Sequence, residues 1–312
     1  MDFQLSEEHL MIQQAARDFV RTECLPGVIE RDEKQQFPRE QISKLADLGF
    51  MGMMVSQDYG GAGLDTVSYV LAMEEISKID ASVSVCMSVN NSLVCFGLEA
   101  YGTEEQKQKY LKPLAQGKKD GELYIGAFLL SEPEAGSDAT SQQTTAEDKG
   151  DHYLLNGTKN WITHGKSGDI AVVVCRTGEP RAKNNATAFV VERGTPGFSG
   201  GKKENKLGMR ASETAEMIFD HCIIPDENRL GAVGAPDRGI APIVQGVVRE
   251  PARADVVPAH RVRPVRERAR LPELVLLVPA ELRRVRAVTR PRAPRRHRPP
   301  RSRRSSAGAR RG

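Results

Sequence analysis

Phe128-Leu-Leu-Ser-Glu-Pro-Glu-Ala-Gly-Ser-Asp138 is the most informative stretch of this 312-residue chain. An apolar run ends at Ser131, and the residues after it, with Pro133, Gly136 and Ser137, are typical of a turn. Turns of small and polar residues expose backbone N–H groups, which can hold phosphates and the polar edges of aromatic cofactors. The same residue types also form ordinary turns between strands, so these residues alone leave both interpretations open.

Short apolar or β-branched runs surround this stretch at 123–130, 170–175 and 187–192. Such runs, bounded by turn residues, are typical of buried strands. Asn156-Gly157 lies between two further apolar runs and predicts a type I′ hairpin turn. We therefore expect an antiparallel, β-barrel-like domain over residues 122–234.

Residues 1–121 have the pattern of an all-α domain. Ser6 is a candidate N-cap, Thr103-Glu-Glu-Gln106 fits a capping box, and Gly49 suits the end of a helix. Helices first and strands second predict an α+β fold class.

Residues 235–312 have a different composition. They contain 21 Arg, no Lys, 6 acidic residues and no aromatic residue, and they hold 11 of the 18 prolines. Their net charge is +15, whereas that of residues 1–234 is −11. High charge, many prolines and few large apolar groups predict a disordered tail.

The five cysteines and six histidines show no metal-ligand spacing, and no C-x-x-C pair is present. We expect reduced thiols, no disulfide framework and no metal site. The first residues lack a signal-peptide pattern, and no apolar run of about 20 residues is evident in the sequence. These features predict a cytoplasmic protein without a transmembrane segment, or one of the mitochondrial matrix if it is eukaryotic.

Three motifs, in the same order, resemble the acyl-CoA dehydrogenase family. They are Ser-Glu-Pro-x-Ala-Gly-Ser-Asp at 131–138, Asn-Gly-x-Lys-x-Trp-Ile-Thr at 156–163 and Leu-Gly-Met-Arg-x-Ser-x-Thr at 207–214. The resemblance covers residues 1–234 and is closest to short-chain or short/branched-chain members. It implies an FAD-dependent oxidoreductase of fatty acid β-oxidation that catalyses α,β-dehydrogenation of an acyl-CoA thioester.

The same resemblance implies a set of FAD-binding residues. Leu130 and Ser131 would hold the pyrimidine edge of the flavin, Trp161 would lie against its rings, and Thr163 would bond near N5. Ser137 would contact both the cofactor and the acyl-CoA substrate. The complete set is Phe128, Leu129, Leu130, Ser131, Ser137, Trp161, Ile162 and Thr163. A tryptophan in a β-domain can also be a packed core residue, and that alternative stays open.

Arg210 has two interpretations, a residue that supports the active site or a structural arginine paired with Glu213 or Glu216. The catalytic residue is unknown. In the family a second helical domain supplies the catalytic glutamate and most of the subunit interface, and no segment after Gly234 resembles it. Glu250 is a poor candidate because Pro251 follows it and no helical pattern surrounds it.

We expect the family's C-terminal four-helix domain to be absent and replaced by the Arg/Pro-rich tail. A frameshift near residue 235 would explain the abrupt change in composition, and it would leave this chain without its catalytic base. The resemblance implies electron-transfer flavoprotein as the electron acceptor and a homo-oligomeric assembly.

Two alternative functions remain open. The Arg-rich tail could bind nucleic acid or an acidic surface nonspecifically, through counterion release. Specific nucleic-acid recognition is not expected, because the tail has no aromatic residues for base stacking. An acyl-CoA oxidase of the same fold is the other alternative.

Overall fold

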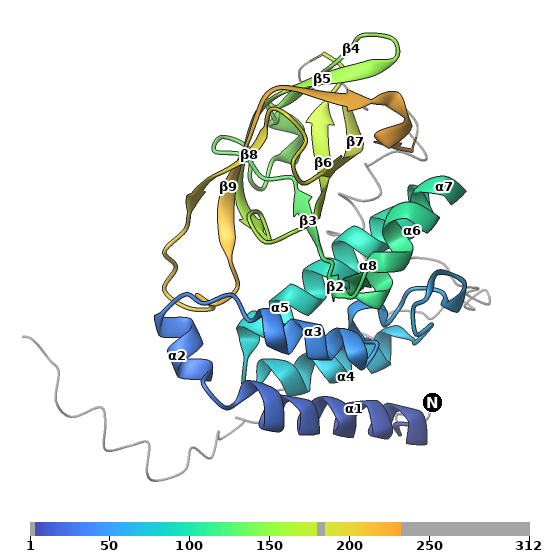
Figure 1. Ribbon diagram of the computed structural model, residues 1–312, viewed down its shortest axis with the longest axis vertical. Coiled ribbons are helices and arrows are strands. Elements are labelled where there is room, and N and C mark those ends of the chain that lie inside the picture. Colours follow the sequence, from blue (N-terminus) through green and yellow to red (C-terminus); the bar gives the residue numbers. More distant parts are fainter. Residues whose placement is uncertain (1–3, 180–184, 232–312) are drawn as a thin grey trace, which may run out of the picture. The chain divides into compact units, whose positions relative to one another are not determined.

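The structure is a computed structural model that describes residues 4–179 and 185–231. All of them belong to one compact unit, Met1–Ala252 (Figure 1). The second unit, Arg253–Gly312, lies outside the described residues. The expected disordered tail and the expected absence of a four-helix domain therefore also lie outside them. Within the described part, helices come first and strands second, which confirms the α+β order.

The helical part follows its predicted start and stop signals. Ser6 caps the first helix in a capping box with His9, and Thr103 forms the predicted box with Gln106. Gly49 ends α3 in the left-handed region at φ 75°. The helical elements are α1 Glu7–Phe19, η1 Val20–Cys24, α2 Val28–Glu33, α3 Arg39–Asp47, η2 Phe50–Gly52, η3 Gln57–Tyr59, α4 Thr66–Ser77, α5 Ala81–Ser88, η4 Val89–Cys95, α6 Phe96–Tyr101, α7 Glu104–Gln106, η5 Lys107–Leu111 and α8 Lys112–Gln116.

One continuous helical stretch, Ala81–Tyr101, is long and apolar enough to cross a membrane by length and composition. This corrects the expectation that no such run exists. In the structure 67% of its most apolar window is buried inside the protein, as in a core helix. Asn90 within it is fully buried, donates to the carbonyl oxygens of Met51 and Leu114, and accepts the backbone N–H of Gly126. This asparagine therefore joins the helical core to the first residue of β3.

The main sheet has the strand order β10-β7-β6-β4-β5-β9-β8, and β3 pairs with β6. A separate two-stranded hairpin precedes it. The elements of this part are β1 Lys118–Lys119, β2 Glu122–Leu123, β3 Gly126–Leu129, η6 Ala139–Ser141, β4 Thr145–Asp148, β5 His152–Thr163, β6 Ile170–Arg176, β7 Ala186–Glu192, β8 Phe198–Lys203, β9 Thr214–Pro225, η7 Asp226–Asn228 and β10 Arg229–Leu230.

Two features differ from the expected antiparallel barrel. Strand β3 runs parallel to β6, because the chain crosses over through β4 and β5 before β6 begins. Strand β4 also meets β6 in parallel, at Thr145 and Arg176. Among the described strands the main pairing path has free ends at β8 and β10, so it is an open sheet and not a closed barrel.

Asn156-Gly157 is not a hairpin turn, so the predicted type I′ turn at these residues is wrong. Strand β5 continues through both residues, with a register shift against β9 between Leu155 and Gly157. Gly157 has φ 144°, and a Cβ at this position would lie 2.6 Å from Thr144 Oγ1. The side-chain oxygen of Asn156 accepts the backbone N–H of His221 on β9. The Asn-Gly pair therefore forms a β-bulge, in which glycine allows the close approach of Thr144.

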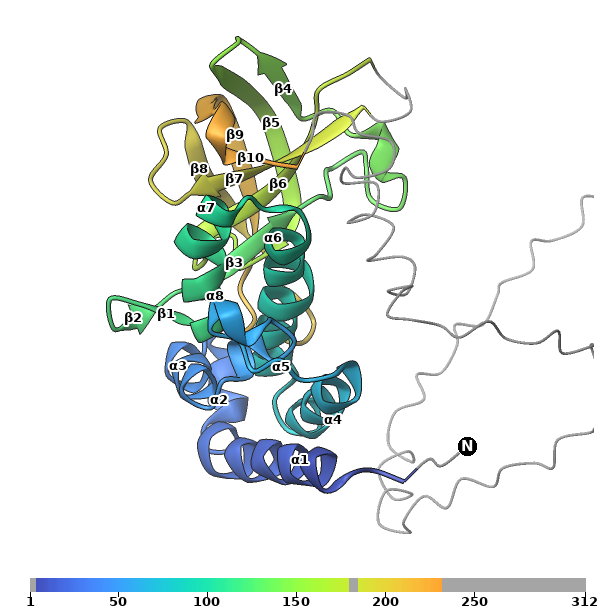
Figure 2. The same cartoon turned by 90° about the vertical axis from the view of Figure 1, so that its right-hand side faces the viewer.

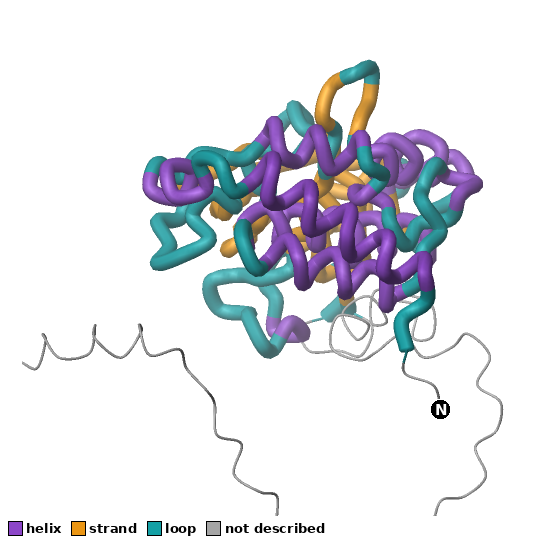
Figure 3. Tube along the Cα trace, turned by 90° about the horizontal axis from the view of Figure 1, so that it is seen from below, coloured by secondary structure: helices purple, strands orange, loops and turns teal. Residues whose placement is uncertain are grey.

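The sheet has two apolar faces, because successive side chains of a strand alternate. On β6, Val172 packs with the helical part, whereas Val173 packs inside the β-part. The end of β3 and the residue after it follow the same pattern, with Phe128 and Leu130 towards the helices and Leu129 away from them. Figure 2 shows α6 and α8 beside β3, and Figure 3 shows the helices gathered on one side of the strands. The end of β3 is thus fixed between two cores.

Candidate functional site

The first predicted segment begins where β3 ends. Phe128, Leu130 and Ser131 are half-buried, and the Leu129 side chain is fully buried in the core of the β-part. The backbone carbonyl of Ser131 accepts the N–H of Asn160 at 2.8 Å. Because its side chain is enclosed, Leu129 can offer only its backbone to a ligand.

The second predicted segment is a bulge at the end of β5. The register against β9 shifts between Lys159 and Ile162, and Trp161 lies within this shift with φ 62°. A non-glycine residue in the left-handed region costs on the order of 1–3 kcal/mol, so the surrounding contacts must hold it there. The bulge leaves Trp161 61% exposed and Ile162 only 2% exposed. The alternative that Trp161 is a packed core residue is therefore wrong for the described structure.

Thr163 and Ser137 are the remaining predicted residues, and each lies at the end of one of the two segments. Thr163 is half-buried and pairs with Thr214 on β9. Ser137 lies on the exposed turn that follows the first segment, next to Gly136, where an added Cβ would meet open space. The structure thus joins the Ser131 and Trp161 segments directly, through the Asn160 hydrogen bond.

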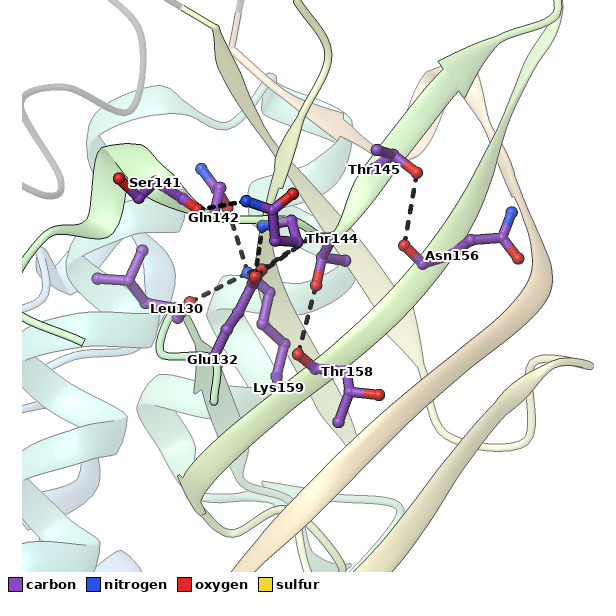
Figure 4. Close-up of polar contacts among 10 residues, drawn as sticks. Leu130, Glu132, Ser141, Gln142, Thr144, Thr145, Asn156, Thr158 and Lys159 are labelled. Carbon is purple, nitrogen blue, oxygen red and sulfur yellow. Dashed lines mark hydrogen bonds and ion pairs between the residues drawn. The ribbon is translucent and has the colours of Figure 1, made fainter. Parts of the chain in front are cut away.

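A buried ion pair lies next to these segments; both of its residues stand in the quoted motifs, but neither was predicted as a site residue. Lys159 Nζ lies 2.7 Å from Glu132 Oε1, and the two side chains are 0% and 2% exposed (Figure 4). Burial alone would raise the pKa of Glu132, but the charge of Lys159 and its hydrogen bond hold that pKa below its ordinary value. Glu132 is therefore ionised at neutral pH.

Arg210 does not make either of the expected ion pairs among the described residues. Its backbone N–H donates to Asp32, and its guanidinium donates to Asn205 at 3.0 Å. Glu213 instead accepts the backbone N–H groups of Lys166 and Ser167. The nearby Leu207 is fully exposed, so this loop presents an apolar side chain to solvent. A role for Arg210 in an active site stays a prediction.

The residues at the end of β3 and β5 fit a flat aromatic group with polar edges. The exposed indole of Trp161 is a large apolar plane in an otherwise buried region. The side-chain oxygen of Asn160 is buried and has no hydrogen-bond partner in the described part of the chain. A ligand that covers the indole and donates a hydrogen bond nearby would satisfy both groups. Among the described residues no group of three or more His, Cys, Asp or Glu side chains could hold a metal ion.

Comparison with known proteins identifies the family. The acyl-CoA dehydrogenase N-terminal domain matches residues 6–118, and the acyl-CoA dehydrogenase middle domain matches residues 127–222. The chain belongs to the acyl-CoA dehydrogenase family.

Several members of this family are similar to the chain. The short-chain specific acyl-CoA dehydrogenase of Clostridium acetobutylicum is 44% identical over 234 residues, which are 75% of this chain and 60% of that protein. The butyryl-CoA dehydrogenase structure from Megasphaera elsdenii is 42% identical with a TM-score of 0.71, and the match covers 75% of this chain and 61% of that one. An acyl-CoA dehydrogenase from Bacillus anthracis, solved in complex with FAD, is 32% identical with a TM-score of 0.70 over 78% of this chain and 41% of that one. The chain thus spans about three fifths of the length of the first two relatives.

Proposed function

We propose that residues 122–231 hold FAD and that the protein is an FAD-dependent dehydrogenase of acyl-CoA thioesters. One observation carries the proposal: an exposed tryptophan on a strained bulge lies beside the polar turn that follows Ser131. An exposed indole offers a flat apolar surface against which an aromatic cofactor can stack. The relative solved with FAD supports this choice of cofactor.

The predicted contacts with FAD are of three kinds: polar contacts, an aromatic contact and contacts made by the backbone alone. Leu130 and Ser131 offer backbone groups and a hydroxyl to the pyrimidine edge, and Thr163 offers a hydroxyl near N5. Trp161 would provide the aromatic plane, and Phe128, whose half-buried side chain packs towards the helical part, would form part of the wall. Leu129 and Ile162 contribute through their backbone, since their side chains are buried. Ser137, on the exposed turn, would contact both the cofactor and the acyl-CoA.

Bound FAD would supply the redox chemistry, accepting hydride from the β-carbon of the thioester while a carboxylate removes the α-proton. The protein residues described here would orient the ring and exclude water from one of its faces. No described residue is assigned as the base, and Glu250 lies outside the described residues. A short acyl chain is the best first substrate, because two of the relatives reported above are named as short-chain specific or butyryl-CoA dehydrogenases.

Several finer expectations belong to this proposal. The domain limits are 1–121, 122–234 and 235–312, with a non-family tail whose origin is a frameshift. Electron-transfer flavoprotein is the proposed acceptor. The family is homo-oligomeric, but the domain that supplies most of its subunit interface is the one expected to be missing here. The proposed location is the cytoplasm, or the mitochondrial matrix in a eukaryote. The two alternatives, a nucleic-acid-binding tail and an oxidase, find no support in the family match or in the relatives named above.

The test is the visible flavin spectrum of the purified full chain before and after anaerobic addition of butyryl-CoA. Retained flavin that bleaches with butyryl-CoA supports both the cofactor and the reaction, and it contradicts the predicted loss of the base. Retained flavin that stays oxidised supports the cofactor site and the predicted loss of the base. A chain that neither retains nor rebinds FAD contradicts the proposal. Trp161→Ala removes the aromatic plane, whereas Trp161→Phe keeps one. Trp161→Phe is therefore the matched control when the FAD affinity of Trp161→Ala is measured.

A further inference from the structure

Lys159 lies where separate segments of the β-part meet. Its ammonium group donates to the carbonyl oxygen of Leu130 at 3.0 Å, to Glu132 at 2.7 Å and to Gln142 at 3.2 Å (Figure 4). These acceptors use all the donors of a lysine side chain. One buried cation therefore joins the end of β3, the turn after it and the segment before β4.

Glu132 extends the same network into the backbone. Its carboxylate accepts the backbone N–H of Thr144 at 3.0 Å and that of Gln143. The hydroxyl of Thr144 in turn donates to the carbonyl of Thr158 on β5, at 3.4 Å. A buried charge is costly unless it is paired and hydrogen-bonded, and both charges here meet that condition. Each backbone partner is consequently held at a defined position.

The sequence positions of the pair matter for the site. Leu130 and Glu132 flank Ser131, so the network holds the backbone on both sides of that residue. Lys159 precedes Asn160, whose N–H donates to Ser131, and Trp161 follows next. The ion pair and the Asn160 hydrogen bond thus join the same two segments. Together they determine the spacing between the polar turn and the exposed indole.

We propose that Glu132 and Lys159 are positioning residues that fix the Ser131 turn and the Trp161 bulge at the spacing that a flavin requires. This inference rests on the proposed FAD site. Stability alone does not explain the pair, because well-packed apolar side chains of similar volume are often equally or more stabilising. A charged pair with several backbone partners instead selects one backbone arrangement.

The chain provides an internal probe for this idea, because Trp161 is its only tryptophan. Fluorescence anisotropy and acrylamide quenching of the full chain without cofactor report how firmly the bulge is held. The key variant is the double substitution Glu132→Gln and Lys159→Met, which leaves no unpaired buried charge. The matched control is Arg17→Met with Glu75→Gln, which removes another ion pair, one that joins α1 to α4.

We expect the Glu132/Lys159 double variant to fold, to lose Trp161 anisotropy and to bind FAD about tenfold or more weakly, which is the size of effect that loss of a supporting residue has at metal sites. The Arg17/Glu75 control should keep both properties. Unchanged anisotropy, quenching and FAD affinity in the folded double variant would overturn the proposal. If wild-type protein binds no FAD, the proposed function fails, but the anisotropy comparison still tests the positioning role.

If the double variant does not fold, Lys159→Arg tests the same proposal with the same measurements. Arginine retains the charge, but its planar, longer head cannot reproduce the compact donor geometry of an ammonium group. We expect a folded protein whose Trp161 is more mobile and more accessible to acrylamide. A Lys159→Arg protein with wild-type Trp161 signals and wild-type FAD affinity would contradict the proposed role.

Discussion

The backbone N–H of Asn160 donates a 2.8 Å hydrogen bond to the carbonyl oxygen of Ser131. This bond joins the turn after β3 to a residue of β5, two motifs that are well separated in the sequence. It holds the strained bulge that exposes Trp161 beside the turn that exposes Ser137. A polar turn and an exposed aromatic side chain are each common by themselves. Because this hydrogen bond joins the segments that carry them, together they form a candidate cofactor-binding surface.

The bulge at Gly157 gives a prediction about stability. Gly157→Ala should destabilise the protein by roughly 1–3 kcal/mol, because its φ is 144° and the new Cβ would lie 2.6 Å from Thr144 Oγ1. Urea unfolding measures this loss. Gly136→Ala is the control, since its Cβ would meet open space, and it should change stability by about 0.5 kcal/mol or less. Equal effects of the two substitutions would refute the close approach.

Acid should weaken the contact between α1 and α4. The hydrogen bond from Arg17 lowers the pKa of the buried Glu75 to about 2. Since this folded-state pKa lies below the unfolded value of about 4.3, the stabilisation is complete above that value and is lost as the pH falls towards about 2. Glu75→Gln should lose on the order of 1–2 kcal/mol at neutral pH and show a flatter acid limb. Parallel pH curves for both proteins would contradict this assignment.

His164 should make stability depend on pH in a higher range. Burial lowers the pKa of its imidazole, although the Gly126 carbonyl and the charge of Glu213 oppose that shift. The unfolded chain therefore binds a proton more readily than the folded protein. The contribution is complete above the unfolded pKa of about 6.5 and is lost as the pH falls below it. The free energy of unfolding should therefore decrease as the pH is lowered from about 7 to about 5. In His164→Asn this decrease should be smaller.

The thiols should be inert in the native protein. All five cysteines are free and buried in the structure, and burial raises the pKa of Cys86 to about 12. Low exposure and a scarce thiolate both slow the reaction with thiol reagents. Native protein should therefore react far more slowly with a chromogenic thiol reagent than unfolded protein does. The unfolded protein should react with five equivalents of the reagent, one for each cysteine. Rapid reaction of one thiol without unfolding would show that its site opens.

The local elements were predictable because they depend on local chemistry. The caps at Ser6 and Thr103 follow from side chains that satisfy backbone N–H groups within one turn. The strands at 170–176 and 186–192 follow from short β-branched runs. The inward side chain of Leu129 was also open to prediction, since strand alternation sets it opposite Phe128 and Leu130.

The remaining features depend on contacts between distant residues. The parallel pairing of β3 with β6 is set by the crossover, which no local pattern reveals. Asn156-Gly157 carries a strong turn signal, but pairing with β9 and the approach of Thr144 override it. Lys159 looks like a solvent-exposed strand residue until Glu132, far away in the sequence, is brought next to it.

The most direct test of the flavin wall is a titration of the purified chain, stripped of any bound cofactor, with FAD while the emission of Trp161 is recorded. The tryptophan is unique and exposed, so a flavin stacked near it must quench its fluorescence. We predict saturable quenching of Trp161 together with a perturbed flavin spectrum, and weaker FAD binding in Trp161→Ala than in Trp161→Phe. Flavin that binds without altering Trp161 emission, or no binding at all, would contradict the proposed wall.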